Sequence, residues 1–274
     1  MLPNRSSRRV AIVGIDGAGK STVIRKFMEQ TPSPVGEVEI LHCPLYHESP
    51  NVPFAQLSRE LDGFSRASDA LGSFEMKAVA MFYQMTLYGP VERFYLEELR
   101  PQILLSDRHA LVDSLAYGPF YLQMVRKPAD RDRLERPLRE RLNGAWESVH
   151  RWHERESHRL SRSVSLWDLP LHVTGLFRLP FPELVLELSR QYRTSLPDVV
   201  LLLDVPGAVA QERIAQRAGA GELHEQTEFL EALRRSYHRV MEALKPLVET
   251  HVIDAGSGSN IDRSFQEVVS KLKT

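Results

Sequence analysis

The sequence predicts an α/β fold, a doubly wound parallel sheet of five strands. Five short apolar runs have the length of strands that are buried on both faces, and helical patterns separate them. The first run also leads straight into a glycine-rich loop and a helix. Alternating strands and helices are typical of a parallel sheet that is covered on both faces. The expected strands are Val10–Gly14, Val38–His42, Ile103–Ser106, Val199–Asp204 and His251–Asp254.

The predicted helices fill the intervals between these strands. After the first strand, Val23, Ile24 and Phe27 recur at the spacing of one helix face. Before the third strand the pattern is again helical, and Gly89-Pro90 is expected to kink or break it. The further helical segments are Arg66–Leu99, Ala208–Arg217, Gln226–Val248 and Ile261–Leu272.

A helical insertion is expected before the fourth strand, at about residues 120–190, within a single domain that spans residues 1–274. This stretch carries no strand signal. Its portion from Arg126 to Arg162 holds eleven Lys and Arg against seven Asp and Glu. The insertion is either a solvated helical cap or a lid or interface that brings basic groups to an anionic substrate.

The composition is that of an ordinary globular protein, with 42% apolar and 26% charged residues. The net charge of −1 gives no indication of a DNA or RNA duplex or of an anionic membrane as partner. Cys43 is the only cysteine, which excludes an internal disulfide and fits a reducing compartment. No apolar run approaches the roughly 18 residues of a membrane helix, and Met1–Arg9 has no apolar signal segment. A cytoplasmic enzyme is therefore expected.

The segment Gly14–Thr22 matches the phosphate-binding pattern GxxxxGK[ST] between a strand and a helix. Glycines allow the backbone amides to turn toward phosphate oxygens. Lys20 is expected to reach the β- and γ-phosphates of ATP, and Ser21 to contact Mg²⁺. The predicted nucleotide-binding residues here are Gly14, Asp16, Gly17, Ala18, Gly19, Lys20, Ser21 and Thr22.

A second motif, Asp107-Arg108, follows the apolar run of the third strand. A carboxylate at this place holds Mg²⁺ directly or through water, so Asp107 and Ser21 are the predicted metal ligands. Arg108 comes at the carboxyl end of the strand, where ligands bind in such sheets. It is expected to clamp a phosphate or to neutralise charge on the transferring group.

A third motif, Glu212-Arg213 with Arg217, precedes a glycine-rich loop. The two arginines are four residues apart and share one helix face. A mobile lid at about residues 213–226 would exclude water and place these arginines over the phosphates. The chain lacks the Asn-Lys-x-Asp sequence with which GTPases recognise guanine, so a switch GTPase is not expected.

Taken together, these motifs resemble those of the thymidylate kinases, a family of P-loop nucleoside monophosphate kinases. The resemblance rests on Gly14–Thr22 with its Asp16, Asp107-Arg108-His109 with Ala116-Tyr117, Leu196–Val205, Glu212-Arg213 with Arg217, Glu225-Gln226 with Phe229-Leu230 and Tyr237, and Val252–Ala255.

The resemblance implies phosphoryl transfer from ATP with Mg²⁺. It further implies that Asp16 contacts the acceptor, and that Arg213 and Arg217 close over the transferring group. The loop at Ala255 and Gly256 would pass near adenine. A homodimer is also implied. The implied catalytic residues are Lys20, Asp16, Arg108, Arg213 and Arg217.

The acceptor side departs from the family. No arginine stands in Cys43–Pro50 or in Met81–Tyr88, the two places where the family carries one. Losing an arginine that pairs with a desolvated phosphate costs about 2–5 kcal/mol. Either a basic group from Arg126–Arg162 replaces it, or the acceptor is not dTMP. Phe82, Tyr83 and Tyr88 are candidates for stacking an aromatic substrate or for the core.

Three functions follow from these patterns. The first is an ATP- and Mg²⁺-dependent kinase that acts on a nucleoside monophosphate, dTMP-like or a modified pyrimidine nucleotide. The second is a related kinase that phosphorylates a hydroxyl of a nucleoside, sugar or other small molecule. The third is a nucleotide-binding regulatory ATPase.

Overall fold

The computed structural model describes residues 7–30, 37–49, 51–216, 227–256 and 261–272. The chain divides into two compact units. The first, here called the sheet unit, is formed by Met1–Cys43, Glu92–Ala116 and Leu196–Thr274. The second, here called the helical unit, is formed by Pro44–Val91 and Tyr117–Ser195.

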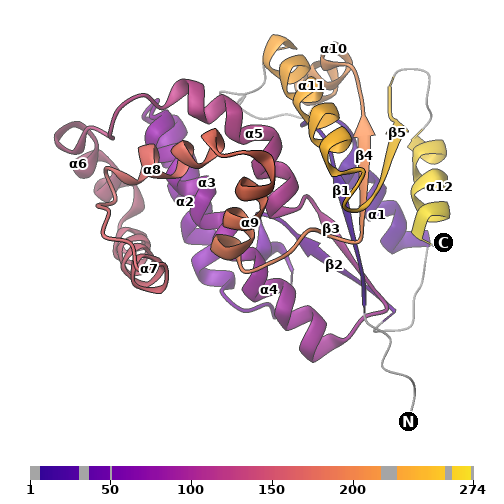
Figure 1. The fold of residues 1–274 in the computed structure, drawn as a ribbon, viewed down its shortest axis with the longest axis horizontal. Coiled ribbons are helices and arrows are strands. Elements are labelled where there is room, and N and C mark those ends of the chain that lie inside the picture. Colours follow the sequence, from indigo (N-terminus) through magenta and orange to yellow (C-terminus); the bar gives the residue numbers. More distant parts are fainter. Residues whose placement is uncertain (1–6, 31–36, 50, 217–226, 257–260, 273–274) are drawn as a thin grey trace. The chain divides into compact units, whose positions relative to one another are not determined.

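The sheet unit contains a five-stranded, all-parallel sheet in the order β2-β3-β1-β4-β5 (Figure 1). The fold class that the sequence predicted is therefore confirmed. β1 starts two residues earlier than expected, β3 runs on through Asp107, and β5 starts at Glu249. The strands are β1 (Arg8–Val13), β2 (Val38–His42), β3 (Ile103–Asp107), β4 (Val199–Asp204) and β5 (Glu249–Asp254).

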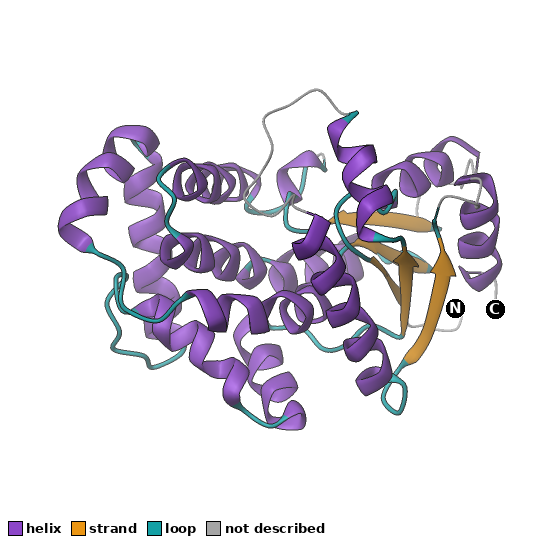
Figure 2. Ribbon diagram, turned by 90° about the horizontal axis from the view of Figure 1, so that it is seen from above, coloured by secondary structure: helices purple, strands orange, loops and turns teal. Residues whose placement is uncertain are grey.

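Helices cover both faces of this sheet (Figures 1 and 2). One pair, α1 and α12, packs together on one face, and the other pair, α10 and α11, packs together on the opposite face. This follows from right-handed crossovers, because the chain moves from β1 toward β2 in one direction and from β4 toward β5 in the other. The helices are α1 (Lys20–Gln30), α10 (Gly207–Ala215), α11 (Thr227–Leu244) and α12 (Ile261–Leu272).

The internal strands β1 and β4 can be buried on both faces because their sequences are continuously apolar. Residues 10–13 of β1 are at most 1% exposed, and Val199–Leu203 of β4 are at most 2% exposed. β5 is an edge strand, and its Val252 is 48% exposed. Ile12 of β1 pairs with Asp107 of β3 and with a residue of β4, so the carboxyl ends of these three strands meet at one edge. That edge is where the predicted site residues gather.

The helical unit contains no strand among its described residues. The predicted insertion is helical, and it forms one compact unit with residues 44–91. α4 and α5 each continue from one unit into the other. The α-helices not yet introduced are α2 (Ala55–Ala70), α3 (Phe74–Thr86), α4 (Tyr88–Phe94), α5 (Ala110–Met124), α6 (Arg131–Leu142), α7 (Ala145–Arg159), α8 (Leu169–Gly175) and α9 (Phe181–Tyr192). Short helical turns lie at Tyr46–Glu48, Tyr95–Leu99 and Leu176–Arg178.

The helix break that was expected at Gly89-Pro90 lies slightly earlier. α3 ends at Thr86 and α4 starts at Tyr88, so Pro90 lies in the first turn of α4. A proline costs little there because its missing N–H would have no partner within the helix. Gly89 is needed for packing, since a Cβ on it would lie 2.2 Å from the carbonyl oxygen of Arg193.

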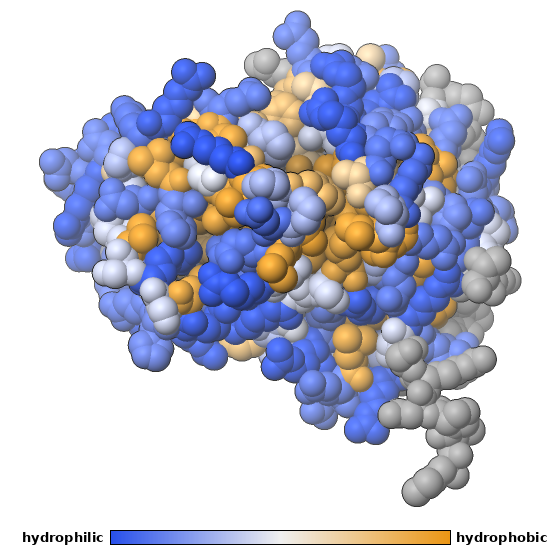
Figure 3. Space-filling model, in the orientation of Figure 1, coloured by the Kyte–Doolittle hydropathy of each residue, from blue (hydrophilic) through white to orange (hydrophobic). Residues whose placement is uncertain are grey.

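Hydrophobic and hydrophilic side chains are interspersed on the face drawn in Figure 3. Among the described residues, the large apolar side chains with the greatest exposure are Leu186 at 73% and Met28 at 60%. Within the same residues, every helix is too short or too polar to cross a membrane.

We predict that Gly89→Ala destabilises the protein by more than about 2 kcal/mol, because the new methyl group would overlap backbone that cannot move away cheaply. Gly175→Ala is the matched control, since nothing lies within 4 Å of the Cβ at that helical position. It should be neutral or slightly stabilising. Urea unfolding of both variants tests this, and equal midpoints would contradict it.

Candidate phosphate-binding site

The loop between β1 and α1 requires glycine at three positions. Gly14, Gly17 and Gly19 have φ values of 145°, 78° and 91°, a region that other residues rarely adopt. A Cβ on Gly17 would also lie 2.4 Å from the carbonyl oxygen of Ala210 in α10. The loop therefore packs tightly against α10, and this contact helps to fix its backbone conformation.

Lys20 is the first residue of α1 and is 6% exposed. Its Nζ donates hydrogen bonds to the carbonyl oxygens of Gly14 and Ile15, both at 2.9 Å. Burial and, to a smaller extent, the neighbouring Arg108 cation lower the pKa of Lys20 to about 8. The amine thus lies at the amino-terminal end of a helix, where backbone N–H groups attract anions. A phosphate group fits this place by charge and by hydrogen bonding.

The two predicted metal ligands lie close together. Ser21 Oγ is 3.4 Å from Asp107 Oδ2, with Ser21 exposed and Asp107 half-buried. In the part of the chain that the structure describes, no group of three or more His, Cys, Asp or Glu is placed to hold a metal ion. Mg²⁺ is commonly bound through one or two carboxylates together with substrate phosphates and water. Ser21 and Asp107 fit that kind of site.

Arg108 is held by several contacts at the carboxyl end of β3. Its backbone has a left-handed φ of 67°, and its N–H donates to Ile12 O at 2.9 Å. The guanidinium forms an ion pair with Asp16 of the loop. It also donates to Asp113 Oδ1 at 2.9 Å and lies 3.4 Å from the Tyr237 hydroxyl. The backbone turn and the carboxylates together direct this cation toward the loop.

Asp113 belongs to the network around Arg108, and the sequence analysis did not name it. It is 2% exposed, and it accepts hydrogen bonds from the backbone N–H of His109 at 2.8 Å and from Tyr237 Oη at 2.6 Å. Tyr237 was one of the residues that carry the resemblance, and its hydroxyl completes this network. The available signal was a lone carboxylate in the otherwise uncharged segment that follows Asp107-Arg108.

Asp204, at the end of β4, lies in the Leu196–Val205 motif but was not predicted to be a site residue. It pairs with Arg234 through two contacts of 2.6 and 2.7 Å, and with His238 at 3.0 Å. Although burial raises the pKa of Asp204, the hydrogen bonds from Arg234 and His238 outweigh this and lower it. These contacts fix α11 against β4, which positions Tyr237 over the network around Asp113.

The remaining predicted residues lie around the same loop or outside the described residues. Arg213 of α10 is half-buried, and its Nη1 donates to Gly17 O at 3.4 Å. Ala255 and Gly256 follow β5 directly and are buried; the Ala255 N–H donates to Asp204 O at 2.8 Å. Arg217 and most of the predicted lid at about residues 213–226 fall outside the described residues.

Three aromatic residues were considered as stacking groups for a substrate, and they lie in the core of the helical unit. Phe82, Tyr83 and Tyr88 are at most 2% exposed. The Tyr83 hydroxyl shares a hydrogen bond of 2.6 Å with His153 Nδ1. Their burial favours the packing role that the sequence left open.

Comparisons with known proteins found solved structures that have the same fold. Neither a family model nor a curated protein matches the sequence. A deoxyadenosine kinase from M. mycoides with bound dATP aligns with a TM-score of 0.51 at 17% identity, covering 97% of this chain and 100% of that one. The same enzyme with dCMP and dCDP aligns with a TM-score of 0.51 at 15% identity, covering 97% and 98%. The chain shares its fold with these kinases.

A thymidylate kinase from Candida albicans also aligns, with a TM-score of 0.48 at 12% identity, over 98% of this chain and 92% of that one. The expected resemblance to P-loop kinases of nucleosides and nucleotides is confirmed as a likeness of fold by the two deoxyadenosine kinase structures.

We predict that Lys20→Met stabilises the folded protein below pH 8. The folded state holds the lysine proton less tightly than the unfolded state, because burial lowers the pKa from 10.5 to about 8. Keeping the amine charged therefore costs up to about 3 kcal/mol below pH 8, and this cost disappears as the pH rises to 10.5. Urea unfolding across that range should show the advantage of the variant shrinking. An advantage that is independent of pH would contradict the argument.

We also predict that Asp113→Asn lowers the free energy of unfolding by about 2–4 kcal/mol, because it removes the buried charge that balances Arg108. Glu29→Gln, at an exposed position of α1, is the matched control and should change stability by less than about 0.5 kcal/mol. Chemical unfolding of both variants tests this. Similar stabilities would show that the pairing contributes little.

Proposed function

We propose that the protein is an ATP- and Mg²⁺-dependent phosphotransferase that phosphorylates a nucleoside monophosphate, dTMP-like or a modified pyrimidine nucleotide. The observation that carries this proposal is the convergence of Lys20, Arg108 and the Ser21–Asp107 pair around one glycine loop. A phosphate loop alone indicates nucleotide binding. The added arginine, held by carboxylates, supplies the positive charge that a transferring phosphoryl group requires.

In this proposal the loop amides and Lys20 hold the triphosphate of ATP. Mg²⁺, bound through Ser21 and Asp107, would neutralise charge on the phosphates. Arg108 leaves its contact with Asp16 to meet the transferring group, while Asp113 keeps the guanidinium in place. Arg213, already beside Gly17, adds a second cation from α10. Asp16, then released, is available to the acceptor.

Other parts of the proposal rest on the sequence. Arg217 joins the catalytic arginines, and Ala255 and Gly256 border adenine. The whole chain works as one cytoplasmic kinase domain with a lid at about residues 213–226, and it acts as a homodimer.

A second candidate function is phosphorylation of a nucleoside or another small-molecule hydroxyl. Two observations favour it. Two structures with the same fold are of a deoxyadenosine kinase, and Met81–Tyr88 carries no arginine for an acceptor phosphate. A regulatory ATPase remains the third candidate, and the same assay separates all three.

An ADP-release assay with ATP, Mg²⁺ and a panel of nucleosides, nucleotides and sugars tests the proposal. Turnover with monophosphates supports the first function, and turnover with unphosphorylated hydroxyls supports the second. ATP loss that no acceptor changes would support the third.

We predict that Lys20→Ala and Arg108→Ala each lower kcat by at least about 100-fold, because each removes charge stabilisation at the phosphates. Lys26→Ala is the matched control, since Lys26 lies on the same helix and pairs with Asp262. It should keep kcat within about threefold, as a surface change away from the site. Wild-type kcat in Arg108→Ala would refute the role given to that arginine.

A further inference from the structure

Arg108 in the sheet unit faces two carboxylates at once. Its guanidinium forms one ion pair with Asp16 of the glycine loop and another with Asp113 of α5, the latter at 2.9 Å. The Arg108 side chain is only 16% exposed, so these charges interact in a partly desolvated place, where Coulomb attraction is stronger than in water. A phosphate group that is to pair with Arg108 therefore has to compete with anions of the protein itself.

The two carboxylates differ in how firmly they are held. Asp113 is 2% exposed, and it also accepts hydrogen bonds from the backbone N–H of His109 and from the hydroxyl of Tyr237. The side chain of Asp16 is 46% exposed. Turning an exposed carboxylate into water costs little, whereas separating Asp113 from Arg108 would leave a buried charge unpaired. Asp16 is thus the partner that an incoming phosphate can replace.

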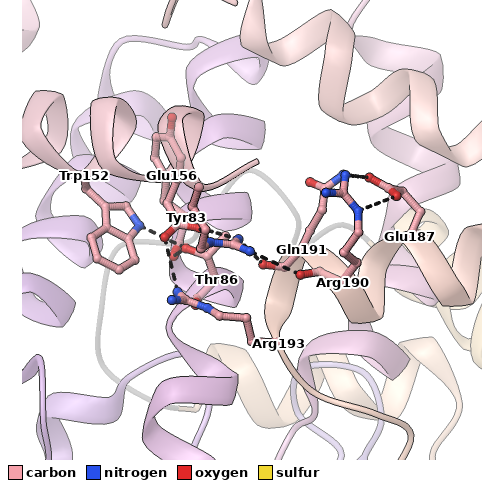
Figure 4. A network of polar contacts seen from close by, with 9 residues as sticks. Tyr83, Thr86, Trp152, Glu156, Glu187, Arg190, Gln191 and Arg193 are labelled. Carbon is pink, nitrogen blue, oxygen red and sulfur yellow. Dashed lines mark hydrogen bonds and ion pairs between the residues drawn. The ribbon is translucent and has the colours of Figure 1, made fainter. Parts of the chain in front are cut away.

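The charged cluster around Glu156 in the helical unit is built the other way (Figure 4). The carboxylate of Glu156 is fully buried, and it accepts from Arg159 at 2.6 and 2.9 Å and from Arg193 at 3.3 Å. One buried anion there serves two cations, which ties α7 to the residue after α9. At Arg108 two anions serve one cation and one of them is exposed, which permits exchange with a ligand.

We propose that Asp16 determines how strongly the site prefers a nucleoside triphosphate to the corresponding diphosphate, by occupying Arg108 in competition with the terminal phosphate. The inference rests on the proposed function, in which Arg108 meets the transferring group. A diphosphate lacks that group, so it can bind to the loop and Lys20 while the ion pair between Asp16 and Arg108 stays intact.

A triphosphate, in contrast, gains the contact with Arg108 only by breaking this ion pair. It also brings negative charge close to the displaced carboxylate of Asp16, and like charges repel. Both effects weaken the binding of the triphosphate and leave that of the diphosphate nearly unchanged. The ion pair therefore reduces the difference in affinity between the two nucleotides.

Calorimetric titration of the full-length protein with ADP and with the β,γ-imido analogue of ATP, each with Mg²⁺, tests this inference. Asp16→Asn keeps the size of the side chain and removes its charge. This variant should bind the ATP analogue at least about fivefold tighter than the wild type does, and ADP within about twofold. The titrations are run at about pH 6.5, where Lys20, with its pKa of about 8, stays charged.

A double-mutant cycle separates competition for Arg108 from the general effect of removing a negative charge near a phosphate. In an Arg108→Met background the guanidinium is gone, so Asp16→Asn should change the affinity for the ATP analogue by less than about twofold. Arg108→Gln serves as the background if the Met variant does not fold, and Asp16→Ala is the second choice at the other position. Glu29→Gln, at an exposed position of α1, removes an equal charge and should leave both affinities unchanged.

Three results would overturn the inference. The first is an affinity of Asp16→Asn for the ATP analogue that is equal to or weaker than that of the wild type. The second is an equal gain for ADP, and the third is a gain that is just as large in the Arg108→Met background.

The proposed function can fail separately. Nucleotide affinities that follow the expected pattern, without phosphoryl transfer to any acceptor in the ADP-release assay, would refute the proposed function and leave this inference intact. Phosphoryl transfer by the wild type, combined with nucleotide affinities that Asp16→Asn leaves unchanged, would do the reverse.

Discussion

The parallel pairing of β1 with β3 and β4 is the constraint on which the site depends. Because parallel strands end at the same edge, the glycine loop after β1, Asp107 at the end of β3 and Asp204 at the end of β4 come together. The glycine loop keeps its shape because its close contacts with α10 leave no space for a side chain at Gly17. The proposed phosphate site thus follows from strand order and register.

Carboxylates at this edge of the sheet hold arginine side chains in fixed positions. Asp113 holds Arg108 and receives the Tyr237 hydroxyl, while Asp204 anchors α11 through Arg234. A charge in a protein interior is tolerable only when it is paired and hydrogen-bonded. Arg108 is therefore positioned directly by Asp113, and Asp204 contributes indirectly by anchoring the helix that carries Tyr237.

The helical unit shows the opposite balance. Three arginines surround the single buried carboxylate of Glu156, and Arg162 has no hydrogen bond among the described residues. In the sheet unit the Arg108 cation is matched by protein carboxylates, whereas in the helical unit Arg159 and Arg193 share the one carboxylate of Glu156.

Local signals were enough to predict the parallel sheet and its five strands from apolar runs, and to mark the glycine loop as a candidate phosphate site from the spacing of its glycines. The sequence also indicated Asp107 and Arg108, which directly follow a strand. It could not indicate that Asp113 pairs with Tyr237 or that Asp204 pairs with Arg234, since the partners lie far apart in the chain and meet only in the folded protein. Nor could it separate Arg162 from the ten other basic residues of Arg126–Arg162. Only tertiary structure decides which arginine is buried and which carboxylates are already paired, because burial and pairing depend on neighbours that the chain brings together from distant segments.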